Sequence, residues 1–318
     1  MYSAEQYRAI TQGAGIVERS SRGRLRVSGA DRRSYLQGLL TNDIAALTPG
    51  TGCYAAYLTA QGRMIADMRL FETGEHLVVD LNGELAASVA DKWSGFVFSE
   101  DVEVADITAA TAEIGIYGPQ APRVAAAVCD LPEPELAAMP MHGNRHAEAG
   151  LVVRSDEAGV PGFDLIVPIA LKDEAVSRAV EAGAVAIDNA LVDAMRIEAG
   201  RPLFLVDMTG DTIPLEAGIE DRAISLTKGC YVGQEIIIRV LHRGHGRVAR
   251  KLVRLAVSGT TVPARGERLT SGGKDVGEIT SAAISPSTGK PIALGYVHRD
   301  FAAPGASVEI GAAAATVV

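Results

Sequence analysis

Residues 228–235 read K-G-C-Y-V-G-Q-E and form the most distinctive stretch of the sequence. Cys230 lies in a basic region, because residues 228–254 carry seven basic side chains against one acidic side chain, Glu235. Positive potential favours the thiolate form of a cysteine, and a helix that began at Gln234 would add to this effect. Two interpretations of Cys230 remain open: a reactive thiol, or a buried, inert cysteine, since free cysteines are among the most buried residues. The basic stretch indicates that an anion is bound nearby.

Composition narrows the class of protein. The chain of 318 residues has a net charge of −9, so binding of nucleic acid by a generally basic surface is not expected. Its apolar runs are far shorter than the roughly 20 residues of a membrane helix, and its start lacks the features of a secretory signal. Three cysteines without a C-x-x-C motif argue against a disulfide scaffold and a zinc site. We therefore expect a cytoplasmic protein that contacts no membrane and holds no metal.

The pattern of predicted strands, helices and turns changes along the chain, which predicts two kinds of architecture. Up to about residue 200, strands occur mostly in hairpin pairs between helices, which is typical of an α+β fold. Proline and histidine in residues 131–146 predict a loop. Beyond about residue 247, short strands alternate with glycine-rich turns, which predicts a small barrel. We expect an α+β body at 1–245, with two subdomains dividing near 100–110, and a barrel at 246–318.

The predicted strands have specific bounds. Two hairpins are expected in the body, with turns at 59–62 and 159–162. In the barrel domain, the apolar patterns predict four strands: 252–257, 276–280, 293–297 and 307–310.

Glu198 is unusual because it lies on the apolar face of a predicted helix, residues 188–199. The residues that share this face are Leu191, Ala194 and Met195. A carboxylate on such a stripe, near a helix C-terminus, needs a partner. Either Arg196 or Arg201 forms an ion pair with it, or it binds a ligand that presents two parallel N–H donors, as a pterin ring does.

Asp67 lies on a predicted strand, on the opposite face from Met64 and Met68. Its side chain therefore points either to solvent or into a cavity, and the spacing leaves both open. Tyr231 has two interpretations as well: stacking on a flat ligand, or ordinary packing.

The stretch 228–235 resembles the signature of the YgfZ-type folate-binding proteins, which are relatives of the glycine-cleavage T-protein, the aminomethyltransferase. Three further stretches are similar to patterns of this superfamily, and the resemblance covers essentially the whole chain. They are R-I-E-A-G-R-P with I-P-L-E at 196–202 and 213–216, L-L-T-N-D at 39–43, and G-R-M at 62–64.

The resemblance implies a tetrahydrofolate-binding α+β body with a central hole and a C-terminal six-stranded barrel. It makes Glu198 the carboxylate that grips the pterin. Asp67 falls near the catalytic aspartate, although the transferase pattern has two adjacent acids where this chain has Ala66 and Asp67. Cys230 is a feature of the YgfZ branch, and the resemblance implies that it acts as a redox-active thiol or as a transient ligand of a metal cluster. The expected folate contacts are completed by Lys228, Tyr231, Gln234, Arg239 and Arg247, the two arginines meeting the glutamate tail.

The resemblance favours a folate-binding accessory factor for assembly or repair of iron–sulfur proteins, with Cys230 as reactive thiol. Iron–sulfur client proteins would be its partners, with a link to tRNA-modification enzymes. One alternative is a folate-dependent aminomethyl or one-carbon transferase that uses Asp67. Another is a folate-binding module without chemistry. Replacing Cys230 by alanine separates the first two, because only the accessory factor should lose its activity.

Overall fold

The computed structural model of the chain describes residues 2–242 and 246–318. Arg243 and His245 of the basic stretch lie outside them, and His245 is also the last residue before the expected 245/246 boundary. The chain divides into two compact units, each built from three segments. The first unit comprises Met1–Tyr57, Ala66–Asn189 and Arg222–Val232, and the second Leu58–Ile65, Ala190–Asp221 and Gly233–Val318.

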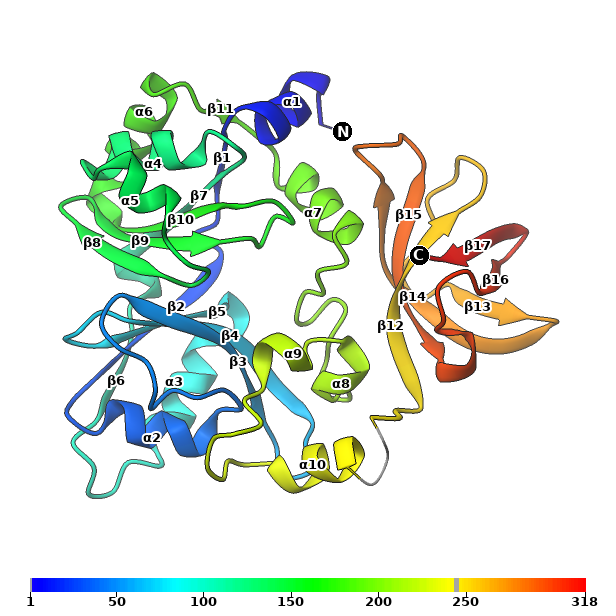
Figure 1. The fold of residues 1–318 in the computed structure, drawn as a ribbon, viewed down its shortest axis with the longest axis horizontal. Coiled ribbons are helices and arrows are strands. Elements are labelled where there is room, and N and C mark those ends of the chain that lie inside the picture. The colour runs from blue at the N-terminus through cyan, green and yellow to red at the C-terminus, as the bar shows by residue number, and fades with distance from the viewer. Residues whose placement is uncertain (1, 243–245) are drawn as a thin grey trace. The chain divides into compact units, whose positions relative to one another are not determined.

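Two sheets form the frame of the first unit (Figure 1). The six-stranded sheet has the order β11 (Val185–Ala186), β1 (Gly15–Glu18), β7 (Thr111–Tyr117), β10 (Gly162–Pro168), β9 (Gly150–Ser155) and β8 (Asn144–Ala147). The five-stranded sheet has the order β3 (Thr51–Leu58), β4 (Met64–Glu72), β5 (Leu77–Asn82), β2 (Arg22–Ser28) and β6 (Glu103–Asp106). Both predicted hairpins of the body, β3–β4 and β9–β10, are present.

Helices join these strands. They are α1 (Ala4–Gln12), α2 (Arg32–Leu39), η1 (Gly83–Leu85), α3 (Ala86–Ser94), η2 (Thr108–Ala110), α4 (Ala121–Cys129), α5 (Glu133–Ala137), η3 (Ile169–Leu171) and α6 (Lys172–Glu181). The later helices are α7 (Asn189–Glu198), α8 (Pro214–Ala217), α9 (Glu220–Ala223), α10 (Gln234–His242) and η4 (Arg299–Phe301). A helix does begin at Gln234, which was the condition for a helix N-terminus close to Cys230.

Strand alternation explains how the two sheets of the first unit meet. On β7, Ile114 and Ile116 point into an apolar core shared with helices α4 and α6. Glu113 lies on the opposite face of β7, where it meets Arg69 of the other sheet. The space between the sheets therefore combines an apolar cluster, which includes Phe71, with buried charges.

The loop expected at 131–146 is wrong in part, because this segment contains α5 and β8. Two of the prolines that suggested a loop, Pro132 and Pro134, lie at the start of α5, where proline is favoured since its missing N–H would have no intrahelical partner. Leu136 of α5 is fully buried.

The second unit contains a closed barrel with the strand order β12, β15, β14, β13, β16, β17 (Figure 1). Their bounds are β12 (Arg250–Val257), β13 (Arg268–Ser271), β14 (Lys274–Ile284), β15 (Pro291–His298), β16 (Ser307–Ile310) and β17 (Ala313–Val317). A Cβ at Gly277 would overlap the carbonyl of Tyr296, so the contact between β14 and β15 requires glycine there. The predicted α+β class and six-stranded barrel are confirmed.

Candidate active site

Asp67 lies on β4, on the face turned toward the six-stranded sheet of the first unit. Its Oδ2 accepts a hydrogen bond of 2.6 Å from the hydroxyl of Tyr54 on β3. The side chain keeps part of its surface exposed, but protein atoms surround the carboxyl group and displace much of the water around it. This burial raises the pKa of Asp67, and the hydrogen bond from Tyr54 opposes the rise. Of the two orientations that the sequence left open, Asp67 takes the one toward the interior.

The L-T-N-D segment fixes the surroundings of Tyr54. Thr41 Oγ1 donates to the carbonyl of Ala223 at 2.6 Å, and Asn42 Nδ2 donates to the carbonyls of Tyr54 and Arg222 at 2.8 and 3.0 Å. The guanidinium of Arg222 lies 5.2 Å from the centre of the Tyr54 ring. The segment therefore ties β3 to α9 and holds the tyrosine ring against a cation.

A buried network of charges adjoins Asp67 along the same face of β4. Arg69, whose side chain is 1% exposed, donates to Asp80 at 2.6 Å and contacts Glu113 at 3.2 Å and Asp164. Burial opposes ionisation of Asp164, but Arg69 and Arg19 outweigh it and hold its pKa well below the usual range. Burial together with Asp80 and Asp164 raises the pKa of Glu113 to about 7. Arg69 joins its own sheet, through Asp80, to the other sheet, through Glu113 and Asp164. The network therefore fixes the position of β4, the strand that carries Asp67.

The K-G-C-Y-V-G-Q-E loop is anchored by Lys228, which is buried. Its Nζ donates three hydrogen bonds, to the carbonyls of Gln37 at 2.7 Å, Leu40 at 2.6 Å and Asn42 at 2.8 Å. These carbonyls lie at the C-terminal end of α2, where a cation is favourable. Burial lowers the pKa of Lys228 to about 8. The side chain of Cys230, two residues on, is exposed, so the buried alternative for this cysteine is wrong.

Tyr231 is buried, with its ring centre 5.2 Å from Nζ of Lys228. Its hydroxyl has no hydrogen-bond partner among the described residues. A buried polar atom without a partner is rare and is often completed by a ligand or water. Tyr231 therefore fits the expectation of a bound folate.

Glu198 lies at the end of α7 in the second unit. Leu191, Ala194 and Met195 are buried as the helical spacing predicts. The carboxylate accepts hydrogen bonds from Ser285, at 2.6 Å, and Ser287, both at Oε1. Within the described residues, Oε2 accepts none, and Glu198 lines a hollow of about 270 Å³. One free carboxylate oxygen fits the binding of a ring N–H.

Arg196, one of the two ion-pair partners considered for Glu198, directs its guanidinium elsewhere. It bonds Asp193 at 2.8 Å, Ser281 at 2.9 Å and the buried Asp207.

The other predicted contacts in the second unit are exposed or partly exposed. Gln234 begins α10, and Arg239 bonds Glu235 at 2.7 Å on the surface of this helix. Arg247 lines a hollow of about 620 Å³ with two more cations, Lys251 and Arg299. Their role toward a glutamate tail stays a prediction.

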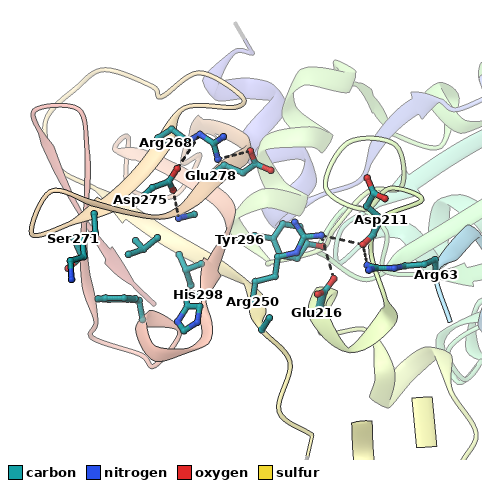
Figure 2. A pocket seen from close by; sticks show the side chains of 16 residues that line it. Arg63, Asp211, Glu216, Arg250, Arg268, Ser271, Asp275, Glu278, Tyr296 and His298 are labelled. Carbon is teal, nitrogen blue, oxygen red and sulfur yellow. Dashed lines mark hydrogen bonds and ion pairs between the residues drawn. The ribbon is translucent and has the colours of Figure 1, made fainter. Parts of the chain in front are cut away.

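A larger hollow, of about 730 Å³, lies on the flank of the barrel (Figure 2). Figure 2 shows that its charged groups pair with one another: Arg268 with Asp275 and Glu278, and Arg250 with Glu216. None of the catalytic or folate-binding residues predicted from the sequence lines it, although Arg250 of the basic stretch does.

Tyr54 and Arg222 are functional candidates that the sequence did not single out. The predicted β3–β4 hairpin brought Tyr54 near Asp67, and this was the signal that could have identified it. Among residues 2–242 and 246–318, no cluster of three or more histidine, cysteine, aspartate or glutamate side chains could hold a metal ion. No helix in the same part of the chain has the length and apolar character needed to cross a bilayer.

Comparison with known proteins places the chain in a family. Residues 1–228 match the profile described as the GCVT N-terminal domain, and residues 250–318 match the glycine cleavage T-protein C-terminal barrel domain. An aminomethyltransferase of Streptomyces coelicolor is 30% identical over 311 residues, which are 95% of this chain and 82% of the relative. One of Thermosynechococcus vestitus is 30% identical over 306 residues, or 94% and 80% of the two chains.

The fold agrees with a solved structure. The glycine cleavage system aminomethyltransferase T from Bartonella henselae superposes with a TM-score of 0.88 at 22% identity, over 99% of this chain and 87% of that one. The YgfZ branch stays a prediction that rests on residues 228–235. The chain belongs to the glycine-cleavage T-protein family, which binds tetrahydrofolate.

Proposed function

We propose that the protein is a tetrahydrofolate-dependent transferase of an aminomethyl or other one-carbon unit, with Asp67 as its acid–base group. The observation that carries the proposal is the carboxyl of Asp67, whose pKa burial raises and which Tyr54 holds in place. Moving a one-carbon unit to or from a nitrogen atom requires a proton to be delivered or removed there. A carboxyl with a raised pKa, held in a fixed orientation, suits that task.

The curated relatives support the same choice, since they are aminomethyltransferases that match along nearly the whole chain. In this proposal, tetrahydrofolate supplies the nitrogen atoms that accept or give up the one-carbon unit. In the first unit, Tyr231 hydrogen-bonds the cofactor through its unpartnered hydroxyl. Binding of the pterin by Glu198 of the second unit stays a separate prediction, which its free Oε2 supports. Lys228 supports the loop that carries Tyr231, because its three donors are already bound to backbone carbonyls.

The test compares Asp67→Asn with Cys230→Ala, using ¹³C-methylenetetrahydrofolate as donor and ammonium with a small thiol as probe acceptors. NMR follows the labelled carbon. We expect Asp67→Asn to lower the transfer rate by about 100-fold or more, the usual effect of losing a general acid–base group, and Cys230→Ala to retain the rate. Equal rates for wild type and Asp67→Asn would refute the proposal.

A second candidate is the accessory factor for iron–sulfur proteins, and the exposed thiol of Cys230 is the observation in its favour. A single cysteine cannot hold a cluster alone, since clusters usually take four ligands. The thiol would therefore act as a redox group or a transient ligand, with iron–sulfur proteins as partners. This candidate would be selected if Cys230→Ala lost the ability to support iron–sulfur proteins while Asp67→Asn kept it in full.

A further inference from the structure

Tyr54 makes a hydrogen bond that separates the two oxygens of the Asp67 carboxylate. Its hydroxyl donates to Oδ2 at 2.6 Å. Oδ1 accepts no hydrogen bond from the residues that the structure describes, and the Asp67 side chain keeps part of its surface exposed. The two oxygens therefore differ, one bound to the protein and one available.

The donor is itself held rigidly. The Tyr54 side chain is buried, its ring lies against the Arg222 guanidinium, and Asn42 bonds the backbone carbonyls of both residues. Burial, followed by the charge of Asp67, keeps the pKa of Tyr54 well above its usual value. The hydroxyl thus remains protonated and can serve only as a donor to the carboxylate.

We propose that Tyr54 is a positioning residue that binds Oδ2 of Asp67 and leaves Oδ1 as the oxygen that exchanges a proton with the folate. The inference rests on the proposed function for the identity of the proton's partner, but the pairing of Tyr54 with Asp67 does not. A fixed carboxylate needs no reorientation when the proton moves, which is how preorganised groups contribute to catalysis.

Other charges also act on Asp67, and they oppose one another. Arg22 of β2 favours the ionised carboxylate, whereas Glu157, which follows β9, and Asp80 of β5 disfavour it. Arg22 is itself paired with Asp80 at 2.5 Å. The hydrogen bond from Tyr54 influences the pKa of Asp67 more than any one of these charges does, so removal of the hydroxyl should change the titration of Asp67 most.

The variant Tyr54→Phe removes the hydroxyl and keeps the ring beside Arg222. In ¹³C-carboxyl-labelled protein, with the Asp67 signal assigned by its absence in Asp67→Asn, we expect the pKa of Asp67 to rise by about one unit. The matched control is Tyr57→Phe on the same strand, which should leave this titration unchanged. An Asp67 titration that is the same in Tyr54→Phe and wild type overturns the proposal.

Kinetics supply the second measurement. We expect Tyr54→Phe to lower kcat by about tenfold, to leave the KM for folate within about twofold, and to move the acidic limb of the pH profile upward. A wild type without transfer activity, together with a shifted Asp67 titration, would reject the proposed function and keep the pairing. Where Tyr54→Phe fails to fold, the Cζ signal of Tyr54 is followed in ¹³C-tyrosine-labelled wild type, and it should shift as Asp67 titrates. A Tyr54 signal that does not respond to the titration of Asp67 would then overturn the proposal.

Discussion

Replacing Lys228 by methionine should destabilise the first unit markedly, because it leaves three backbone carbonyls without their donor. The carbonyl of Leu40 is in a buried bond, and those of Gln37 and Asn42 are in partly buried ones. A buried acceptor without a partner costs about 2 kcal/mol, and each partly buried one, which water can reach, costs about 0.5 kcal/mol. The free energy of unfolding should therefore fall by about 3 kcal/mol.

The assay is urea unfolding followed by tryptophan fluorescence. The sequence has a single tryptophan, Trp93, and it is fully buried in α3 of the first unit, so its signal reports on this unit. In a thermal scan the same loss corresponds to a decrease in Tm of about 6 to 12 °C for a unit of this size.

The matched control is Lys172→Met. Lys172 also lies in the first unit, but it makes a single exposed ion pair, with Glu18 at 2.6 Å. Exposed pairs contribute about 0 to 1 kcal/mol, so the control should change little. A Lys228→Met variant that unfolds within about 0.5 kcal/mol of wild type would contradict the anchoring role of this ammonium group.

Three further predictions concern the cofactor, the barrel and acid. In calorimetric titration with tetrahydrofolate under reducing conditions, Glu198→Gln should bind at least tenfold more weakly than wild type (about 1.4 kcal/mol), and Cys230→Ala should bind as wild type does. A Glu198→Gln variant with the affinity of wild type would remove Glu198 from the pterin site. Asp207→Ala should destabilise the second unit by about 3 kcal/mol, because the buried guanidinium of Arg196 loses its buried carboxylate partner and keeps only the exposed Asp193 as counter-charge. Hydrogen exchange of β14 should show this loss, and unchanged exchange would contradict it. Despite their burial, Asp80 and Asp164 have lowered pKa values because arginines surround them. Their contribution to the stability of the folded protein is therefore complete above about pH 4 and is lost as the pH falls toward the folded-state pKa values. Tryptophan-monitored unfolding at pH 6, 4 and 3 checks this, and an unfolding free energy that stays constant would argue against it.

Much of the fold follows from local patterns in the sequence. Alternation and turn glycines predicted the β9–β10 hairpin, and the same signals predicted four of the barrel strands that the structure contains. β13 and β17 escaped because their residues are poor strand formers by composition, R-L-T-S and A-A-A-T-V. Their pairing with neighbours in a closed barrel, which no local pattern reveals, makes them strands.

The site was predictable where one residue contradicts its local surroundings. Glu198 on an apolar helix face is such a residue, and so is Cys230 in a basic stretch. Arg69 was not found, because an arginine on an alternating strand resembles any solvent-facing residue. It is buried only because a second sheet covers that face. Tyr54 lies in an apolar run for which ordinary packing is sufficient explanation.

The first unit is built from three separate segments of the chain, and this has a consequence for synthesis on the ribosome. This unit needs residues 222–232, which supply Arg222 and Lys228, although most of it ends at Asn189. A nascent chain released only to residue 200 holds both sheets but lacks the two cations that secure Tyr54 and the end of α2. The barrel strands, by contrast, form one continuous stretch from Arg250 to Val317 and emerge together. Translation therefore completes the surroundings of Asp67 and Tyr54 late, after the sheets that carry these two residues have already been made.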